Sequence, residues 1–257
     1  MEAPPGACVL RRREVHEHMK TYLLLHGAMR GAWLWNTIIP LLEKSGAKVI
    51  AYDLPGHGRR TAEHAGVNMS AYVADVLSFI KTNNVSDIIL VGHSMSGIVI
   101  SRVAEEAPER IRHLVYLGAV VPQDGDALID LLPQERQEAL RKLEGRVSEL
   151  FGPLETLRPL YFTDLEGKEK DQYVKQLTPQ PAAVFFERIS LKKFSGVQVP
   201  RTYVLGLKDK SIPPELAKQY AGRLGVEPVE IDAGHDMMVS RPREVAEVLL
   251  SVGSGGR

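Results

Sequence analysis

The chain has 257 residues, of which 44% are hydrophobic and 25% are charged. These values are typical of a globular protein with room for one large α/β domain and an inserted lobe. Basic and acidic residues both number 32, so the formal charge is zero, which does not favour binding to nucleic acid or to an anionic membrane surface. Cys8 is the single cysteine, which excludes an internal disulfide and a cysteine-based zinc site.

Two features of the sequence bear on the location of the protein in the cell. No window approaches the roughly 18 consecutive apolar residues that a membrane span requires. The first 18 residues contain Arg11-Arg12-Arg13 but lack the apolar stretch of a secretion signal. We therefore expect a cytoplasmic protein with no membrane partner, whose residues 1–18 form a flexible N-terminal tail.

Short apolar runs alternate with amphipathic segments along the chain. The expected strands cover residues 21–25, 48–52, 87–91, 113–117, 202–207 and 228–231. The expected helices cover residues 33–44, 70–82, 95–106, 214–224 and 242–250. This alternation is typical of βα repeats around a mostly parallel twisted sheet flanked by helices. We therefore predict an α/β fold whose core spans residues 19–121 and 201–252.

Residues 122–200 interrupt this alternation, because they show helical periodicity but no convincing strand. Their apolar residues at helical spacing include Leu128, Ile129, Leu131, Leu132, Leu140 and Leu143. A segment of this length is too long for a plain connection in a compact domain. We expect a helical cap folded over the carboxyl edge of the sheet. A separate domain or a disordered insert is the alternative, and the apolar content argues against disorder.

Ser94 is the most informative residue for function. It lies in Gly92-His93-Ser94-Met95-Ser96-Gly97, between an apolar run and a helical pattern. A strand that turns sharply into a helix strains the corner residue and exposes its side chain as a nucleophile. The usual pattern is Gly-x-Ser-x-Gly; here Ser96 replaces the last glycine and is small enough to keep strand and helix close. A glycine-rich strand end without a chemical role is the alternative.

A nucleophilic serine needs a histidine base that is oriented by a carboxylate. Among the eight histidines, His235 lies between the last predicted strand and the last predicted helix, so its loop returns to the sheet edge that holds Ser94. Asp209 follows the penultimate strand, which gives the chain order Ser94, Asp209, His235. Asp124 and Asp126, after the preceding strand, are the alternatives for the carboxylate.

The same chemistry builds negative charge on a carbonyl oxygen, and two preorganised backbone N–H groups lower that barrier. Met95, directly after the predicted nucleophile, is expected to supply one N–H group. Ala28, in the glycine-rich turn at residues 26–31, is expected to supply the other. A turn that only reverses the chain is the alternative for this segment.

Together these segments resemble the α/β-hydrolase fold superfamily, with signals from residue 21 to residue 250. A closer resemblance is to the branch that contains plant methyl esterases, hydroxynitrile lyases and bacterial carboxylesterases. It rests on residues 26–35 (His-Gly-Ala-x-x-Gly-Ala-Trp-x-Trp), 92–95 (Gly-His-Ser-Met), 177–181 (Leu-Thr-Pro-Gln-Pro) and 209–213 (Asp-Lys-Ser-Ile-Pro). The resemblance implies that Ser94, Asp209 and His235 form a catalytic triad, and that Ala28 and Met95 form the oxyanion hole.

The resemblance also bears on the choice between esterase and lyase. Lyases of this branch tend to have threonine where Gly27 stands and lysine directly after the catalytic histidine, where this chain has Asp236. The lysine stabilises departing cyanide, and an aspartate is expected to oppose an anion there. We therefore predict a serine carboxylesterase. A hydroxynitrile lyase is one alternative, and a non-catalytic small-ligand receptor of the same fold is another.

The predicted enzyme uses no cofactor and no metal. The apolar residues of the cap predict a mainly apolar pocket with one polar end, suited to small or medium esters that react through an acyl-enzyme. Trp33, Trp35, Phe162 and Phe185 are candidates for lining this pocket, with core packing as the alternative. The expected partner is a small-molecule ester, not nucleic acid or a membrane, and the sequence leaves a homodimer open.

Overall fold

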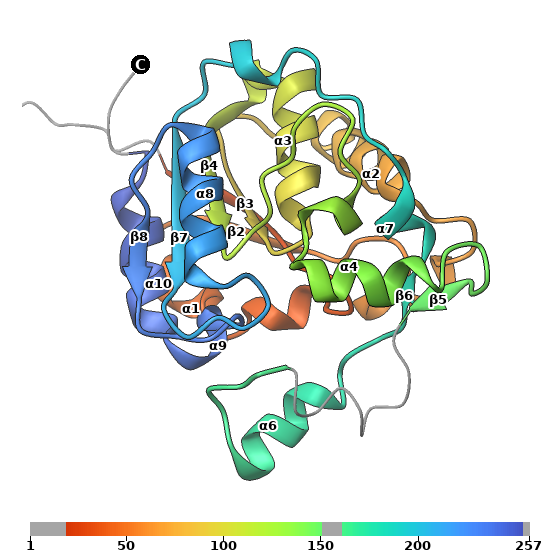
Figure 1. Ribbon diagram of the computed structural model, residues 1–257. Helices are drawn as coiled ribbons and strands as arrows, with labels where there is room; N and C mark the ends of the chain where they lie inside the picture. Colours follow the sequence, from red (N-terminus) through yellow and green to blue (C-terminus); the bar gives the residue numbers. More distant parts are fainter. Residues whose placement is uncertain (1–18, 151–160, 254–257) are drawn as a thin grey trace, which may run out of the picture.

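Figure 1 shows the computed structural model, which describes residues 19–150 and 161–253; the expected tail at residues 1–18 lies outside them. A six-stranded parallel sheet lies at the centre, with the strand order β2-β1-β3-β4-β7-β8. Its strands are β1 (Thr21–Leu25), β2 (Lys48–Tyr52), β3 (Ile88–His93), β4 (Ile111–Leu117), β7 (Arg201–Gly206) and β8 (Val229–Ile231). The predicted α/β architecture with a parallel sheet is confirmed.

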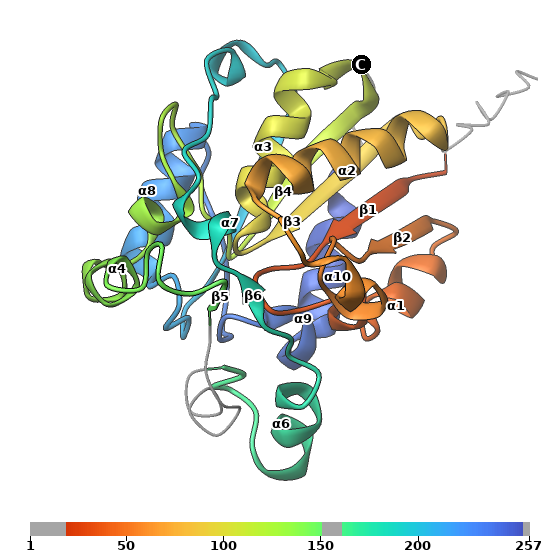
Figure 2. The same cartoon turned by 90° about the vertical axis from the view of Figure 1, so that its right-hand side faces the viewer.

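Helices cover both faces of the sheet (Figure 1, Figure 2). One face carries α2 (Met69–Thr82), α3 (Ser96–Glu106) and α8 (Pro214–Leu224), and the other carries α1 (Ile39–Glu43) and α10 (Pro242–Ser251). Alternate strand residues contribute to the two cores: Leu23 and Leu25 pack on the first face, and Tyr22 and Leu24 on the second. Because side chains alternate along a strand and both faces are covered, the central strands β1 and β3 are nearly continuous apolar runs in the sequence.

The strands and most helices lie within two residues of the predicted bounds, but the helix predicted over residues 33–44 is wrong. Those residues form a 3-10 turn, η1 (Ala32–Trp35), followed by the short helix α1. Pro40 explains the break. Proline lacks a backbone N–H and its ring clashes with the preceding helical turn, so a helix begins near it but does not run through it.

The described part of residues 122–200 contains short helices and one small ribbon. The helical elements are η4 (Leu128–Leu131), α4 (Gln134–Arg141), α6 (Gly167–Val174), α7 (Ala183–Phe186) and η5 (Phe194–Gly196). Strands β5 (Glu149–Leu150) and β6 (Gln180–Pro181) pair antiparallel, so the expectation of no strand in this segment is wrong. Strands of two residues are too short to show a period of two in the sequence.

Three further short turns complete the described elements: η2 (Gly58–Glu63), η3 (Pro108–Arg110) and α9 (Met237–Ser240). None of the helices in the described ranges is long and apolar enough to cross a membrane.

The strand order changes direction between β1 and β3. From β1 the chain adds β2 on one side, then crosses to β3 on the other side and continues outward through β4, β7 and β8. At such a switch point the loops after the two central strands diverge, and a crevice opens at their carboxyl ends. The loop after β1 and the turn after β3 therefore border the same crevice.

Candidate active site

Ser94 lies at the corner between β3 and α3. Its φ is +53°, a left-handed value that is rare for a residue with a side chain and that costs free energy. Ser94 O accepts hydrogen bonds from Gly97 N (3.1 Å) and Val120 N (3.1 Å). The corner is therefore held in its strained conformation by its neighbours.

Gly97 is the glycine with the least room at this corner. A Cβ on Gly97 would lie 1.9 Å from Val120 O, which is closer than real contacts allow. Ser96, at the position where the usual pattern has glycine, is buried, and its hydroxyl donates to His26 O (2.5 Å). The departure from the usual pattern thus ties the corner to the loop after β1 and keeps strand and helix close.

His235, in the turn before α9, connects Ser94 to Asp209. Its Nε2 lies 2.9 Å from Ser94 Oγ, and its Nδ1 lies 2.7 Å from Asp209 Oδ2. The second carboxylate oxygen of Asp209 accepts hydrogen bonds from the backbone N–H groups of Ser211 (2.7 Å) and Ile212 (2.9 Å). A carboxylate at Nδ1 favours the proton on that nitrogen, which leaves Nε2 as the acceptor that faces the serine hydroxyl.

The alternative carboxylates are engaged elsewhere. Asp124 Oδ1 accepts a hydrogen bond from a backbone N–H in the segment before η5 (2.7 Å). Asp126 Oδ2 accepts one from the backbone N–H three residues earlier (2.8 Å). The structure thus brings Asp209, and neither alternative, into contact with His235.

Ala28 and Met95 border the same cavity as Ser94. Among the hydrogen bonds of the described residues, neither of their backbone N–H groups donates to a protein acceptor. A developing oxyanion requires two such unpaired N–H groups near the nucleophile. The positions of Ala28 and Met95 are compatible with that role.

The peptide between Ala28 and Met29 is held at both ends. Arg30 Nη1 donates to Ala28 O (2.9 Å), and Met29 N donates to Gln180 Oε1 (3.0 Å). Met29 has a φ of +67°, and its own carbonyl accepts a hydrogen bond from Thr178 N (2.9 Å). Thr178 and Gln180 belong to the motif at residues 177–181. This motif therefore fixes the loop that presents the Ala28 N–H, a connection that the sequence did not reveal.

Gln180 is itself anchored in a buried network. Its Nε2 donates to Tyr72 OH (3.0 Å), and that oxygen lies 2.9 Å from His57 Nε2. The other ring nitrogen of His57 lies 2.8 Å from Thr178 Oγ1. Burial and the neighbouring histidines lower the pKa of His57 to about 2, so the ring is neutral and serves one hydroxyl as acceptor and the other as donor.

Asp236, directly after His235, forms a buried ion pair with Arg30. Arg30 Nε donates to Asp236 Oδ1 (2.7 Å) and Nη2 donates to Oδ2 (2.8 Å), and the two side chains are 2% and 0% exposed. Burial by itself raises the pKa of Asp236, but the charge and hydrogen bonds of Arg30 outweigh burial and lower the pKa to about 2. The expectation that Asp236 opposes an anion in the pocket is therefore wrong in its premise, because Arg30 balances its charge. Arg30 was not foreseen as a functional residue, although it lies in the turn at residues 26–31.

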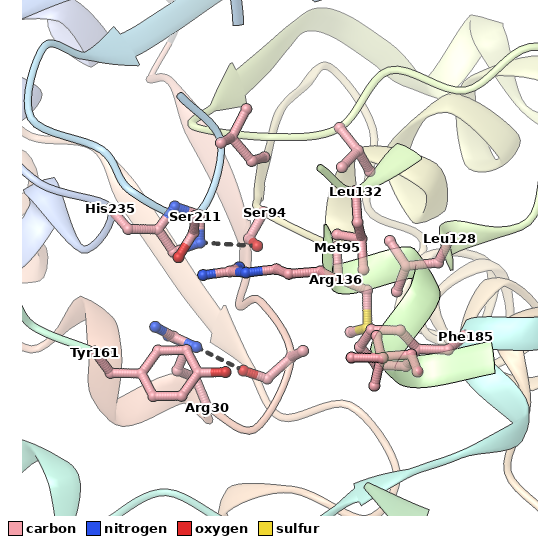
Figure 3. Close-up of a pocket in the computed structure, with 15 residues that line it drawn as sticks. Arg30, Ser94, Met95, Leu128, Leu132, Arg136, Tyr161, Phe185, Ser211 and His235 are labelled. Atoms are coloured by element: carbon pink, nitrogen blue, oxygen red, sulfur yellow. Dashed lines mark hydrogen bonds between the residues drawn. The ribbon is translucent and has the colours of Figure 1, made fainter. Parts of the chain in front are cut away.

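A cavity of about 210 Å³ opens over Ser94 and His235 (Figure 3). Its apolar lining residues are Ala28, Met95, Val120, Leu128, Leu132, Ala139, Leu140, Phe185 and Ile212. Of the four aromatic candidates, Phe185 lines this cavity, whereas Trp35 is buried in the core and Trp33 packs against Phe162 with 6.4 Å between ring centres. Within residues 19–150 and 161–253, no group of three or more His, Cys, Asp or Glu side chains is placed to hold a metal ion.

The chain is similar in sequence to known proteins along nearly its whole length. Residues 22–248 match the model of the alpha/beta hydrolase family. The chain is 32% identical over 250 residues to the carbendazim hydrolyzing esterase of Nocardioides sp. (strain SG-4G), a match that covers 91% of this chain and 100% of that protein. It is 31% identical over 257 residues to polyneuridine aldehyde esterase of Rauvolfia serpentina, covering 92% and 96% of the two chains.

The fold of the chain is also similar to that of a solved structure. It is an extracellular alpha/beta-hydrolase from a Paenibacillus species, described as sharing structural and functional homology with tobacco salicylic acid binding protein 2. It superposes on this chain with a TM-score of 0.83 and 28% identity, covering 92% of this chain and 100% of that chain.

Proposed function

The chain belongs to the α/β hydrolase family, and from this premise we propose that it is a serine carboxylesterase acting on small to medium, largely apolar carboxylic esters. Two relatives that cover nearly the whole chain are esterases, which supports ester hydrolysis. The observation that carries the proposal is the pair of contacts that joins Ser94 to His235 and His235 to Asp209 beside an apolar cavity.

In the first half of the reaction, Ser94 Oγ attacks the carbonyl carbon of the ester while its proton passes to His235 Nε2. The negative charge that develops on the carbonyl oxygen is stabilised by the N–H groups of Ala28 and Met95. Asp209 keeps the imidazole oriented and stabilises its positive charge. The ester C–O bond then breaks, the proton on Nε2 passes to the departing alkoxide, and an alcohol leaves an acyl-enzyme behind.

In the second half, water attacks the acyl carbon and gives a proton to His235 Nε2. A second oxyanion forms in the same site, the bond to Ser94 Oγ breaks, and the proton returns from His235 to that oxygen. The products are a carboxylic acid and the free enzyme. The reaction needs no electron donor or acceptor, and every proton is accounted for by Ser94, His235, water and the leaving alcohol.

We assign residues 122–200 the role of a cap over the hydrolase core at residues 19–121 and 201–252. Leu128, Leu132, Leu140 and Phe185 from this segment line the cavity over Ser94, which supports the assignment. Because these side chains are apolar and the cavity is small, the pocket suits an ester with apolar substituents rather than a long polymer.

Replacement of Ser94 by alanine tests the proposal. Hydrolysis of p-nitrophenyl acetate is expected to fall by about 10⁴-fold or more, because the nucleophile is gone. An organophosphonate probe is expected to label the wild-type protein on the peptide that contains Ser94, as located by mass spectrometry. Ser45→Ala, at an exposed serine after α1, is the control and is expected to retain turnover and labelling. Unchanged turnover in Ser94→Ala would refute the proposal.

The alternative functions give different results. A hydroxynitrile lyase would release cyanide from mandelonitrile, and a receptor would bind a small ligand tightly with turnover near the solvent background. A Cβ at Gly27 would lie 2.8 Å from Ser94 Cβ and 2.9 Å from His93 Nδ1, so the threonine typical of the lyases does not fit here without a shift of the corner. This observation favours the esterase.

A further inference from the structure

The cavity over Ser94 contains a cation that the proposed mechanism does not use. Arg136 lies on α4, is half-buried, and lines the cavity together with Ser94 and His235. In Figure 3 its guanidinium extends from the cap toward Ser94 and Ser211. The other side chains of the cap that line the cavity are mostly apolar, so Arg136 brings a positive charge into an otherwise apolar part of the lining.

The backbone N–H of Arg136 bonds within α4, but its guanidinium has no hydrogen-bond or ion-pair partner within the described ranges of the chain. The carboxylates that are close to it in the sequence are turned elsewhere. Asp130 pairs with Arg141 (2.5 Å). Glu135 and Glu138, on α4 itself, are exposed to solvent. The charge of Arg136 is therefore not balanced by this part of the protein.

The other arginine of the cavity, Arg30, is already neutralised by the buried carboxylate of Asp236. Both arginine charges nevertheless reach the cavity lining. Burial raises the pKa of Tyr161, and the charges of Arg30 and Arg136 act in the opposite direction. Among the described lining residues, Arg136 is thus the cation that remains for a ligand.

A half-buried guanidinium with no protein partner is a strong site for a carboxylate. Its planar N–H groups bind the two carboxylate oxygens side by side. The apolar surroundings reduce screening by water, which strengthens the attraction compared with an exposed arginine.

We propose that the preferred substrates carry a free carboxylate besides the ester, and that Arg136 binds this carboxylate while Ser94 attacks the ester carbonyl. The substrate class is an anionic monoester. This inference rests on the proposed esterase function and narrows it. The carboxylate belongs either to the acyl part, as in the half-ester of a dicarboxylic acid, or to the alcohol part, as in an acylated hydroxy acid.

Two matched substrate pairs distinguish a carboxylate in the acyl part from one in the alcohol part. Monomethyl glutarate and dimethyl glutarate differ by a carboxylate on the acyl side. The pair 4-acetoxybenzoate and methyl 4-acetoxybenzoate differs by a carboxylate on the alcohol side. For at least one pair, kcat/KM of the wild-type enzyme is expected to favour the anion. In Arg136→Gln the ratio of anion to neutral ester is expected to fall by about 10- to 100-fold, mainly through KM of the anion.

Two further variants sharpen the result. Arg136→Lys keeps the charge but not the fork of N–H groups, so it is expected to restore part of the preference. Arg141→Gln removes a neighbouring cation of α4 that pairs with Asp130 and is absent from the cavity lining. It is expected to leave the anion-to-neutral ratio unchanged.

A binding measurement keeps the inference testable without turnover. Glutarate is expected to bind Ser94→Ala protein by calorimetry, and adding Arg136→Gln is expected to weaken that binding by a similar factor. If the wild-type enzyme hydrolyses the neutral esters and Arg136→Gln changes neither the ratio nor glutarate binding, this inference fails while the esterase stands. If no ester is hydrolysed but glutarate binding depends on Arg136, the esterase proposal fails and the carboxylate site stands.

Discussion

Replacing Asp236 by asparagine is expected to destabilise the folded protein by about 3 kcal/mol, because it leaves the guanidinium of Arg30 buried without a counter-charge. The two side chains are 2% and 0% exposed and are joined by hydrogen bonds of 2.7 and 2.8 Å. Breaking a buried pair on one side costs about 3–5 kcal/mol, and the asparagine oxygen retains one acceptor for Arg30, which places the expectation at the lower end. At about 2–4 °C per kcal/mol for a domain of this size, Tm falls by about 6–12 °C.

Urea unfolding followed by circular dichroism measures this loss, and a second ion pair supplies the control. Lys208 and Asp232 approach to 2.8 Å, but their side chains are 57% and 60% exposed. A pair exposed to solvent contributes little, because water screens its charges and both side chains lose freedom, so Asp232→Asn is expected to have a small effect. Equal, small losses in Asp236→Asn and Asp232→Asn would refute the argument from burial.

A double variant separates stability from activity. Arg30→Met with Asp236→Leu removes both charges and is expected to recover most of the stability, because no uncompensated charge remains. Its esterase activity is expected to fall below that of the wild type, since methionine at position 30 cannot donate to Ala28 O as Arg30 does. A double variant as unstable as Asp236→Asn would contradict this account.

The same pair predicts a loss of stability in acid. The pKa of Asp236 in the folded protein is lowered to about 2, below the value of about 3.9 expected in the unfolded chain. The stabilisation is therefore complete above about pH 4 and is lost as the pH falls from there toward 2, because the unfolded chain takes up the proton first. Urea unfolding between pH 5 and pH 3 is expected to show this contribution in the wild type and not in Asp236→Asn.

Three further predictions concern the surroundings of the site. Gln180→Leu leaves the buried N–H of Met29 without an acceptor, so we expect a stability loss of about 1–3 kcal/mol. We also expect kcat to fall by a larger factor than KM changes. An unchanged kcat would argue that Gln180 does not position the loop at residues 26–31. Gly97→Ala places a Cβ 1.9 Å from a backbone carbonyl oxygen and is expected to abolish soluble expression or activity. The control is Gly222→Ala, in open space on α8, which is expected to be neutral or stabilising by less than about 1 kcal/mol. The pKa of His57 is lowered to about 2, below the value of about 6.5 in the unfolded chain. The unfolded chain therefore takes up a proton first, and stability falls as the pH drops below about 6.5, by about 2 kcal/mol from pH 7 to pH 5. Urea unfolding of His57→Gln is expected to show a correspondingly flatter pH dependence.

Local patterns in the sequence were enough to predict the elements on which the site is built. Apolar runs bounded by turn residues located β1 and β2 at their observed bounds and the remaining sheet strands within two residues. The small residues around Ser94 predicted a sharp turn between strand and helix, which the φ of +53° at Ser94 confirms. These signals are local, since periodicity and turn chemistry depend on residues a few positions apart.

The contacts between distant side chains could be seen only in three dimensions. It brought Asp209, and not Asp124 or Asp126, to His235. It paired Arg30 with Asp236 across 206 positions of the chain, and it joined Met29 to Gln180 across 151. Such contacts depend on the order of the strands and on how residues 122–150 and 161–200 pack against the core. Because neither the strand order nor this packing leaves a periodic pattern in the sequence, the charge balance and the anchoring of the loop at residues 26–31 became visible only in three dimensions.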